Sequence, residues 1–231
     1  MYIPKAIAAL PKWTDNEASR YRLSCVRLRR AGGFVFAEAT DGRRLCRLTW
    51  ASEGPECEYR LEGKVLSKAL KTVGVSDGGY FAGQTQADWS SQSPITNVRF
   101  VGKIPALMLY GKNCGQTVPS EDAEKTWPKT EDVLYPPDKS KREGIDTYWL
   151  RDKARKFIKE NPKAKPMAMD LQVGPVTMRM DAKFLRDMAE TAIQCGYDEV
   201  QVSATDKQSA VHFHATNDVQ FEAVIMPLAA D

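Results

Sequence analysis

Polar and apolar residues alternate over much of the N-terminal third of the chain, with the period of two that half-buried β-strands show. Residues 21–30, 34–40 and 44–50 follow this pattern. The dipeptides Gly32-Gly33 and Asp41-Gly42 separate the three segments, and both favour tight turns between antiparallel strands. The pattern therefore predicts a three-stranded β-meander.

Four other segments have apolar residues at the spacing of three to four positions that marks amphipathic helices. They predict helices over residues 3–13, 63–73, 147–161 and 181–194. Gly74 is a natural end for the second, and Cys195-Gly196 for the fourth. Further strands are predicted over residues 79–83, 97–101, 106–110, 176–180, 199–204, 210–215 and 220–226.

A helix followed by antiparallel strands occurs in both halves of the chain, which indicates an α+β protein built from two units of related design. Residues 116–138 contain four prolines and little apolar periodicity, so they are typical of a linker. We therefore expect one domain over residues 1–118, a linker over 119–138 and a second domain over 139–231.

Composition places the chain among ordinary globular proteins, with 231 residues, 42% hydrophobic and 27% charged. The net charge of +3 does not by itself indicate a nucleic-acid partner. Its distribution is uneven, however. Residues 116–138 carry six acidic residues against two lysines, whereas residues 139–165 carry ten basic residues against four acidic ones.

The basic residues form rows along predicted helices. Lys64, Lys68 and Lys71 share one helix face, and Arg151, Arg155 and Lys159 share another, with Lys156 beside them. Such rows contact phosphates without reading bases, although many are only solvated helix faces. Lys183 is a weaker candidate, because Asp187 and Glu190 share its helix face.

No arrangement of residues indicates an active site. Nucleophile and phosphate-loop motifs are absent, so we predict no catalytic residue, no cofactor and no enzyme. His212 and His214 share a strand face and leave open a small-molecule or metal-dependent enzyme of unknown type. Two histidines on a solvated face explain them better, so we predict no metal.

The remaining features favour a cytoplasmic protein. We expect no signal peptide and no membrane span, because the N-terminus lacks a basic-then-apolar pattern and no apolar run is long enough. The five cysteines are widely spaced and lack a C-x-x-C pair, which predicts buried or half-buried reduced thiols.

Five short motifs, in order along the chain, resemble those of the bacterial DNA polymerase III beta subunit, the sliding clamp. They are R-Y-R-L at residues 20–23, A-E-A-T-D-G-R-R-L at 37–45, Trp127-Pro128 with Val133, M-D-A-K-F-L at 180–185, and V-I-M-P-L at 224–228. The resemblance implies counterparts of the second and third of the family's three domains only.

The resemblance also implies a function in DNA replication. Family members close into rings around duplex DNA, with helices lining the hole, and a two-domain chain would need to form a homotrimer to build six domains. Lys64, Lys68, Lys71, Arg151, Arg155, Lys156, Lys159 and Lys183 would then face the phosphates.

A partner pocket between the two domains is implied as well, and it would take a short peptide from a DNA polymerase or repair protein. Its residues would be Leu23, Thr40, Gly42, Arg43, Arg44, Leu45, Pro128, Val133, Val224, Met226, Pro227 and Leu228. Plain packing between domains is the alternative explanation for these residues.

Three departures from the family pattern bear on this expectation. The first family domain has no counterpart, and the C-terminal unit is short, with room for about one strand between residues 161 and 176. Arg43 stands where the family often has His, and Asp132 where it often has a basic residue. A clamp-fold module that binds a protein without encircling DNA therefore stays an open alternative.

Overall fold

The computed structural model describes residues 1–15, 23–75, 80–84, 106–112, 114–121, 127–134 and 142–229. These residues divide by their contacts into two compact units. The first takes in Met1–Ala39 and Thr49–Trp127, and the second takes in Thr40–Leu48 and Pro128–Asp231. The division after Trp127 falls inside the stretch predicted as a linker, while the exact domain bounds stay a prediction.

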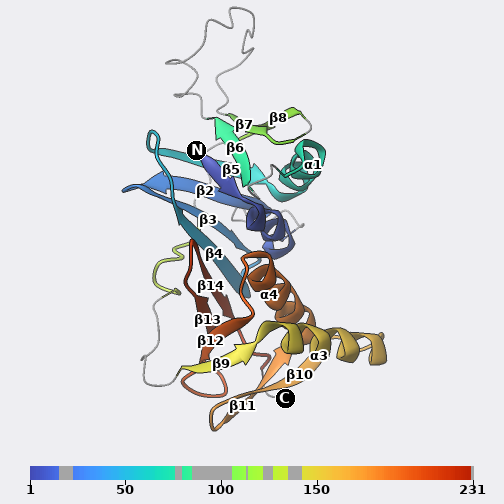
Figure 1. Ribbon diagram of the computed structural model, residues 1–231. Helices are drawn as coiled ribbons and strands as arrows, with labels where there is room; N and C mark the ends of the chain where they lie inside the picture. The colour runs from blue at the N-terminus through green and yellow to red at the C-terminus, as the bar shows by residue number, and fades with distance from the viewer. Residues whose placement is uncertain are drawn as a thin grey trace, which may run out of the picture. The chain divides into compact units, whose positions relative to one another are not determined.

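The first unit contains two groups of antiparallel strands and two helices (Figure 1). One sheet has the order β1-β6-β7-β8, and in the other β2 lies between β5 and β3. The elements are β1 (Tyr2–Pro4), the 3-10 helix η1 (Lys5–Trp13), β2 (Cys25–Ala31), β3 (Phe34–Thr40), β5 (Cys57–Glu62), α1 (Gly63–Val73), β6 (Tyr80–Gln84), β7 (Ala106–Tyr110) and β8 (Gly115–Pro119).

Helix α1 buries the apolar face that its sequence predicted. Leu66, Leu70 and Val73 are at most 3% exposed and pack in the first unit, where α1 contacts η1 and β8. Val65 was expected on that face, but it lies at the edge of the stripe and is 36% exposed. Gly74 ends the helix with a φ of 66°, a conformation that glycine adopts at little cost.

The second unit is one sheet with two helices, and a separate hairpin (Figure 1). The sheet has the strand order β4-β14-β13-β12-β9 and the hairpin is β10-β11. The elements are β4 (Arg44–Ala51, of which the residues up to Leu48 belong to this unit), β9 (Glu143–Asp146), α3 (Thr147–Glu160), β10 (Ala168–Val173), β11 (Val176–Asp181), α4 (Ala182–Gln194), β12 (Glu199–Ser203), β13 (Val211–Ala215) and β14 (Val219–Ile225).

Buried and half-buried residues alternate along β13 and show which face of this sheet packs against the core. Val211, Phe213 and Ala215 are buried, whereas His212 and His214 between them are half-buried on the opposite face. Helix α4 packs against β14 and β11, and α3 packs against α4. Asp181 begins α4 by accepting a hydrogen bond from the backbone of Lys183 at 2.8 Å.

The fold is α+β with two sheet-and-helix units, as the sequence predicted, and the second unit is the shorter one. Among the described residues its smaller sheet is the hairpin β10-β11, where the first unit has four strands. Strands β1, β5, β8 and β9 are not among the predicted elements, and β8 lies mostly in the stretch 116–138 whose sequence is typical of a linker. The strand predicted over residues 97–101 and the motif residues 20–22 lie outside the described residues.

Candidate functional site

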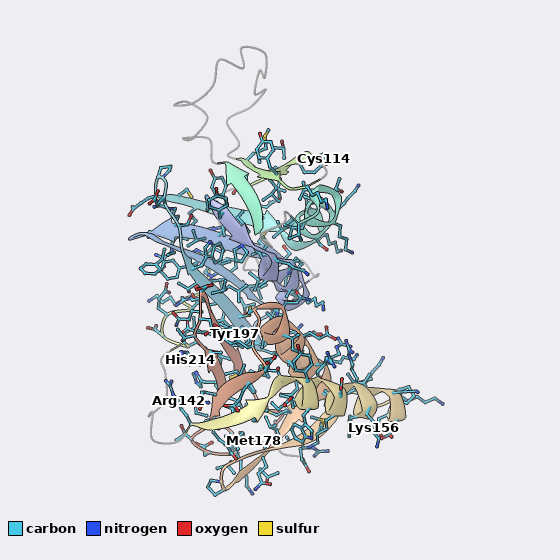
Figure 2. All side chains as sticks on the ribbon, viewed as in Figure 1. Cys114, Arg142, Lys156, Met178, Tyr197 and His214 are labelled. Atoms are coloured by element: carbon cyan, nitrogen blue, oxygen red, sulfur yellow. The ribbon has the colours of Figure 1, made fainter. Side chains whose placement is uncertain are left out.

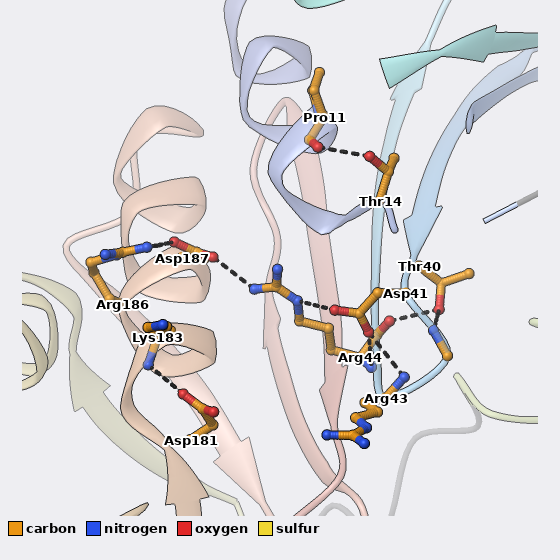
Figure 3. Close-up of polar contacts among 11 residues, drawn as sticks. Pro11, Thr14, Thr40, Asp41, Arg43, Arg44, Asp181, Lys183, Arg186 and Asp187 are labelled. Carbon is orange, nitrogen blue, oxygen red and sulfur yellow. Dashed lines mark hydrogen bonds and ion pairs between the residues drawn. The ribbon is translucent and has the colours of Figure 1, made fainter. Parts of the chain in front are cut away.

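A tight turn joins β3 to β4, and its polar contacts are drawn in Figure 3. The Thr40 hydroxyl donates to the carbonyl of Arg44 at 2.6 Å and accepts from the N–H of Gly42 at 3.1 Å. Asp41 Oδ1 accepts from the N–H groups of Arg43 and Arg44 at 2.9 and 3.1 Å. Gly42 has a φ of 88°, which favours glycine. The turn is thus held by its own side chains.

Arg44 joins this turn to helix α4 within the second unit. Its Nε donates to Asp41 at 2.9 Å and its Nη1 donates to Asp187 at 2.8 Å. The guanidinium carbon lies 4.3 Å from the ring centroid of Phe184, and Arg186 occupies the other oxygen of Asp187 at 2.7 Å. Arg44 and Asp187 are only 8% and 6% exposed, so this is a buried ionic network.

The C-terminal segment after β14 lies against the same turn. The N–H of Met226 donates to the carbonyl of Arg43 at 2.9 Å, and the N–H of Leu228 donates to the carbonyl of Arg179 at 2.8 Å. Met226 was expected inside a strand, but β14 ends at Ile225 and the Met226 side chain is 45% exposed. An exposed methionine with a fixed backbone is a suitable apolar contact for a partner.

The same unit contains a small buried apolar cluster. Leu45, Leu134 and Val224 pack together with at most 7% exposure, and Ala210 lies against them. Arg47 contacts the segment before Leu134: its Nη2 lies 3.4 Å from the Thr130 hydroxyl and 3.7 Å from a carboxylate oxygen of Glu131. This places residues 128–134 on the second unit's sheet.

Most of the predicted pocket residues therefore belong to the second unit. Hydrogen bonds join Thr40 to Gly42 and Arg44, and Met226 to Arg43. Leu45 and Val224 are in apolar contact within the buried cluster. Val133 is 43% exposed, while Pro128, Pro227 and Leu228 are half-buried. Leu23 belongs to the first unit, where its carbonyl accepts from the N–H of Asp15. The peptide pocket itself stays a prediction.

Sequence reasoning missed Asp187 as part of this site, as well as Phe184. Asp187 was considered only as a carboxylate that weakens the basic face of its helix. No local signal could have revealed its role, because its partner Arg44 lies 143 positions earlier in the chain.

The two histidines line a cavity of about 20 Å³ on the outer face of the sheet in the second unit, which also touches Leu134 and Val224. Figure 2 labels His214 and Arg142, which lie on the same side of this unit and both line the cavity. His214 Nε2 lies 3.1 Å from the Thr216 hydroxyl. Burial lowers the pKa of both histidines, and Arg142 lowers that of His214 further.

The described residues hold no group of three or more histidine, cysteine or acidic side chains that could bind a metal ion. All five cysteines are free thiols; four are buried or half-buried as predicted, and Cys114 is exposed. Burial raises the pKa of Cys195 to about 12 and that of Cys46 well above its usual value, which makes both thiols poor nucleophiles.

The basic residues proposed for phosphate contact lie on helix surfaces. Lys64, Lys68 and Lys71 are exposed on α1 in the first unit. On α3, Arg155 pairs with Glu190 of α4 at 2.8 Å, Arg151 pairs with Asp152, and Lys156 lies 3.9 Å from Glu160. Lys159 on α3 and Lys183 on α4 are exposed as well.

Arg155 and Lys156 stay accessible in these pairs, because both side chains are exposed and ion pairs at a surface contribute little energy in water. Lys156 projects from α3 with 77% of its side chain exposed (Figure 2). Among the described residues, no helix is long and apolar enough to span a membrane.

Comparisons with solved structures identify the fold. The structure is similar to the DNA polymerase III beta chain of Streptococcus pneumoniae, with a TM-score of 0.71 and 12% identity. It is similar to the DNA polymerase sliding clamps of Pseudomonas aeruginosa, with a TM-score of 0.69 and 16% identity, and of Bacillus subtilis, with 0.70 and 15%.

Each match covers 100% of this chain, and the chain spans about two-thirds of the length of these clamps, 64% to 66%. Neither the family models nor the curated proteins give a match. The described part of the chain therefore has the sliding-clamp fold, and the predicted resemblance is confirmed for the fold.

Proposed function

We propose that this protein is a sliding-clamp-like DNA-binding protein, a processivity factor or scaffold without enzymatic activity. It corresponds to the last two of the three domains of the bacterial clamps. The observation that carries the proposal is the whole-chain similarity to three bacterial clamps, combined with exposed basic residues on α1 and α3.

Contact with DNA is proposed through phosphates, not through bases. The candidate side chains extend from rigid helices, and lysine and arginine at such positions replace condensed counterions on the duplex. The proposed contacts are Lys64, Lys68, Lys71, Arg151, Arg155, Lys156, Lys159 and Lys183.

A protein partner is proposed at the surface around Met226. Met226 offers an exposed apolar side chain beside the turn at Arg43, and Val133 offers another next to Leu134 of the apolar cluster. An extended peptide from a DNA polymerase or repair protein, with apolar anchors, suits such a surface.

The test of DNA contact is duplex binding measured by fluorescence anisotropy, with a labelled duplex of about 30 base pairs between about 50 and about 200 mM salt. We expect the logarithm of the association constant to fall linearly with the logarithm of the salt concentration. Replacing Lys64, Lys68 and Lys71 together by glutamine should reduce the slope by about 3 if each contacts one phosphate. Lys207→Gln, an exposed lysine of a loop, is the matched control.

A second candidate function is a clamp-fold module that binds a protein but does not encircle DNA. The carboxylates beside Arg151, Arg155 and Lys156 favour it, because they lower the positive potential that a phosphate would meet at these accessible cations. Duplex binding that is weak, and equally weak in the triple glutamine variant, would select this candidate over the first.

A further inference from the structure

Two large aromatic side chains stand exposed at the start of α3. Tyr148 is 43% exposed and Trp149 is 52% exposed, whereas Leu150 beside them is fully buried. Adjacent exposed aromatic residues are uncommon on a solvent-facing helix, and they contribute nothing to the core that Leu150 and Ala154 fill. Their position needs a separate explanation.

The backbone that carries these rings is fixed. Asp146 Oδ1 accepts from the N–H of Trp149 at 2.7 Å and so caps the helix. The buried Thr147 donates from its hydroxyl to the carbonyl of Tyr197 at 2.8 Å and from its N–H to that of Asp198 at 2.9 Å. The rings are therefore presented by a rigid helix terminus, which reduces the entropy cost of binding.

Cations accompany both rings. The Nζ of Lys153 lies 4.7 Å from the ring centroid of Trp149, and the guanidinium carbon of Arg151 lies 5.1 Å from that of Tyr148. Lys156 lies one turn further along the same face as Trp149 and Lys153, at the helical spacing of i, i+4 and i+7. Along this face the ring of Trp149 is thus followed by two cations, and the ring of Tyr148 lies on the adjacent face beside Arg151.

We propose that Tyr148 and Trp149 form a stacking platform for unpaired bases of single-stranded nucleic acid, with Lys153 and Lys156 on the adjoining phosphates. This proposal rests on the proposed function, because both require that α3 binds nucleic acid. It goes further, because phosphate contact to a duplex uses cations alone, whereas a stacking platform needs bases that are free of a duplex stack.

The positive charge of α3 favours single-stranded nucleic acid over an uncharged ligand. The exposed positions of α3 carry the four basic residues Lys153, Arg155, Lys156 and Lys159 against the two acids Asp152 and Glu160, and Arg151 beside them is half-buried. A polyanion with planar, π-faced bases matches both the cations and the rings. Stacking of a base on an aromatic side chain is largely independent of sequence, because every base has a π-face.

The test uses the full chain and an oligothymidylate of about 12 nucleotides, a length within the site sizes of single-strand binders. Binding is followed by anisotropy of a labelled oligonucleotide and by quenching of tryptophan fluorescence. We expect Trp149→Ala to weaken binding at least about fivefold, and Trp149→Phe to restore most of it. Phe34→Ala, an exposed aromatic residue of β3, is the matched control and should change nothing.

The two proposals fail separately. Trp149-dependent binding of oligothymidylate without duplex binding would support the platform and contradict the proposed function. Equal affinity of wild type and Trp149→Ala for oligothymidylate would overturn the platform, even if salt-dependent duplex binding is intact. Trp149-dependent binding to phosphatidylserine vesicles, with none to oligothymidylate, would also overturn it, in favour of a membrane surface.

Discussion

The guanidinium of Arg44 donates a hydrogen bond of 2.8 Å to the carboxylate of Asp187, 143 positions later in the chain. Both groups are buried, and the contact fastens the turn after β3 to helix α4 of the second unit. The same turn provides the carbonyl of Arg43 that binds the Met226 N–H. The ionic pair therefore positions the surface proposed for the partner.

Removing the carboxylate should destabilise the second unit strongly. Asp187→Ala removes an acidic partner of the buried Arg44 cation, which Asp41 also contacts, and losing one side of a buried pair costs about 3–5 kcal/mol. Urea unfolding of the full chain measures this change. Asp152→Ala, which removes an exposed pair with Arg151, is the control and should leave the unfolding midpoint nearly unchanged. Equal midpoints for the two variants would show that the network adds no stability.

Met226→Asp should abolish peptide binding and leave the fold intact. Met226 is 45% exposed, so a carboxylate there stays solvated in the free protein but would be desolvated under an apolar peptide anchor. Calorimetric titration with a decapeptide that carries leucine and phenylalanine anchors measures the loss. Tyr110→Asp places the same charge at an exposed aromatic residue of β7 and should bind the peptide normally. Unchanged affinity in Met226→Asp would remove this residue from the proposed surface.

Stability should fall as the pH drops below the ordinary histidine pKa. Burial lowers the pKa of His212 and His214 in the folded state, so the unfolded chain takes up protons first on acidification. The loss begins near a pH of about 6.5 and continues down to the lowered folded pKa values. Arg142 and Glu222 also line the cavity and therefore face the two histidines.

The double variant His212→Gln/His214→Gln isolates this contribution. Its unfolding free energy should depend less on pH than that of the wild type between a pH of about 7 and about 5. Parallel pH profiles for both proteins would assign the acid sensitivity to carboxylates instead.

A ring built from two-domain chains requires a homotrimer. Sedimentation equilibrium at micromolar protein should give three times the chain mass of 25.8 kDa, and a nicked circular duplex should retain the protein better than the same DNA made linear. A strict monomer that treats circular and linear DNA alike would favour the module that binds protein only.

Local patterns in the sequence determined most of the elements. The bounds predicted for α1, β3 and β7 match the structure, because hydrophobic periodicity and neighbouring glycines act within a few residues. Strands such as β9, with four residues, and β8, in a proline-rich stretch, have no such pattern. They form because a neighbouring strand supplies hydrogen-bond partners, which only the tertiary structure brings near.

Some features of the candidate site likewise follow from the local sequence, and others only from the tertiary structure. The rows of basic residues and the Asp41-Gly42 turn follow from the sequence alone, since helical spacing and turn preference are local properties. Tertiary structure alone decided that Arg44 meets Asp187 and that Arg155 meets Glu190. It also decided that Tyr148 and Trp149 stay in solvent while Leu150 is buried. Burial and ion pairing depend on which surfaces pack, and that is settled by contacts between distant segments.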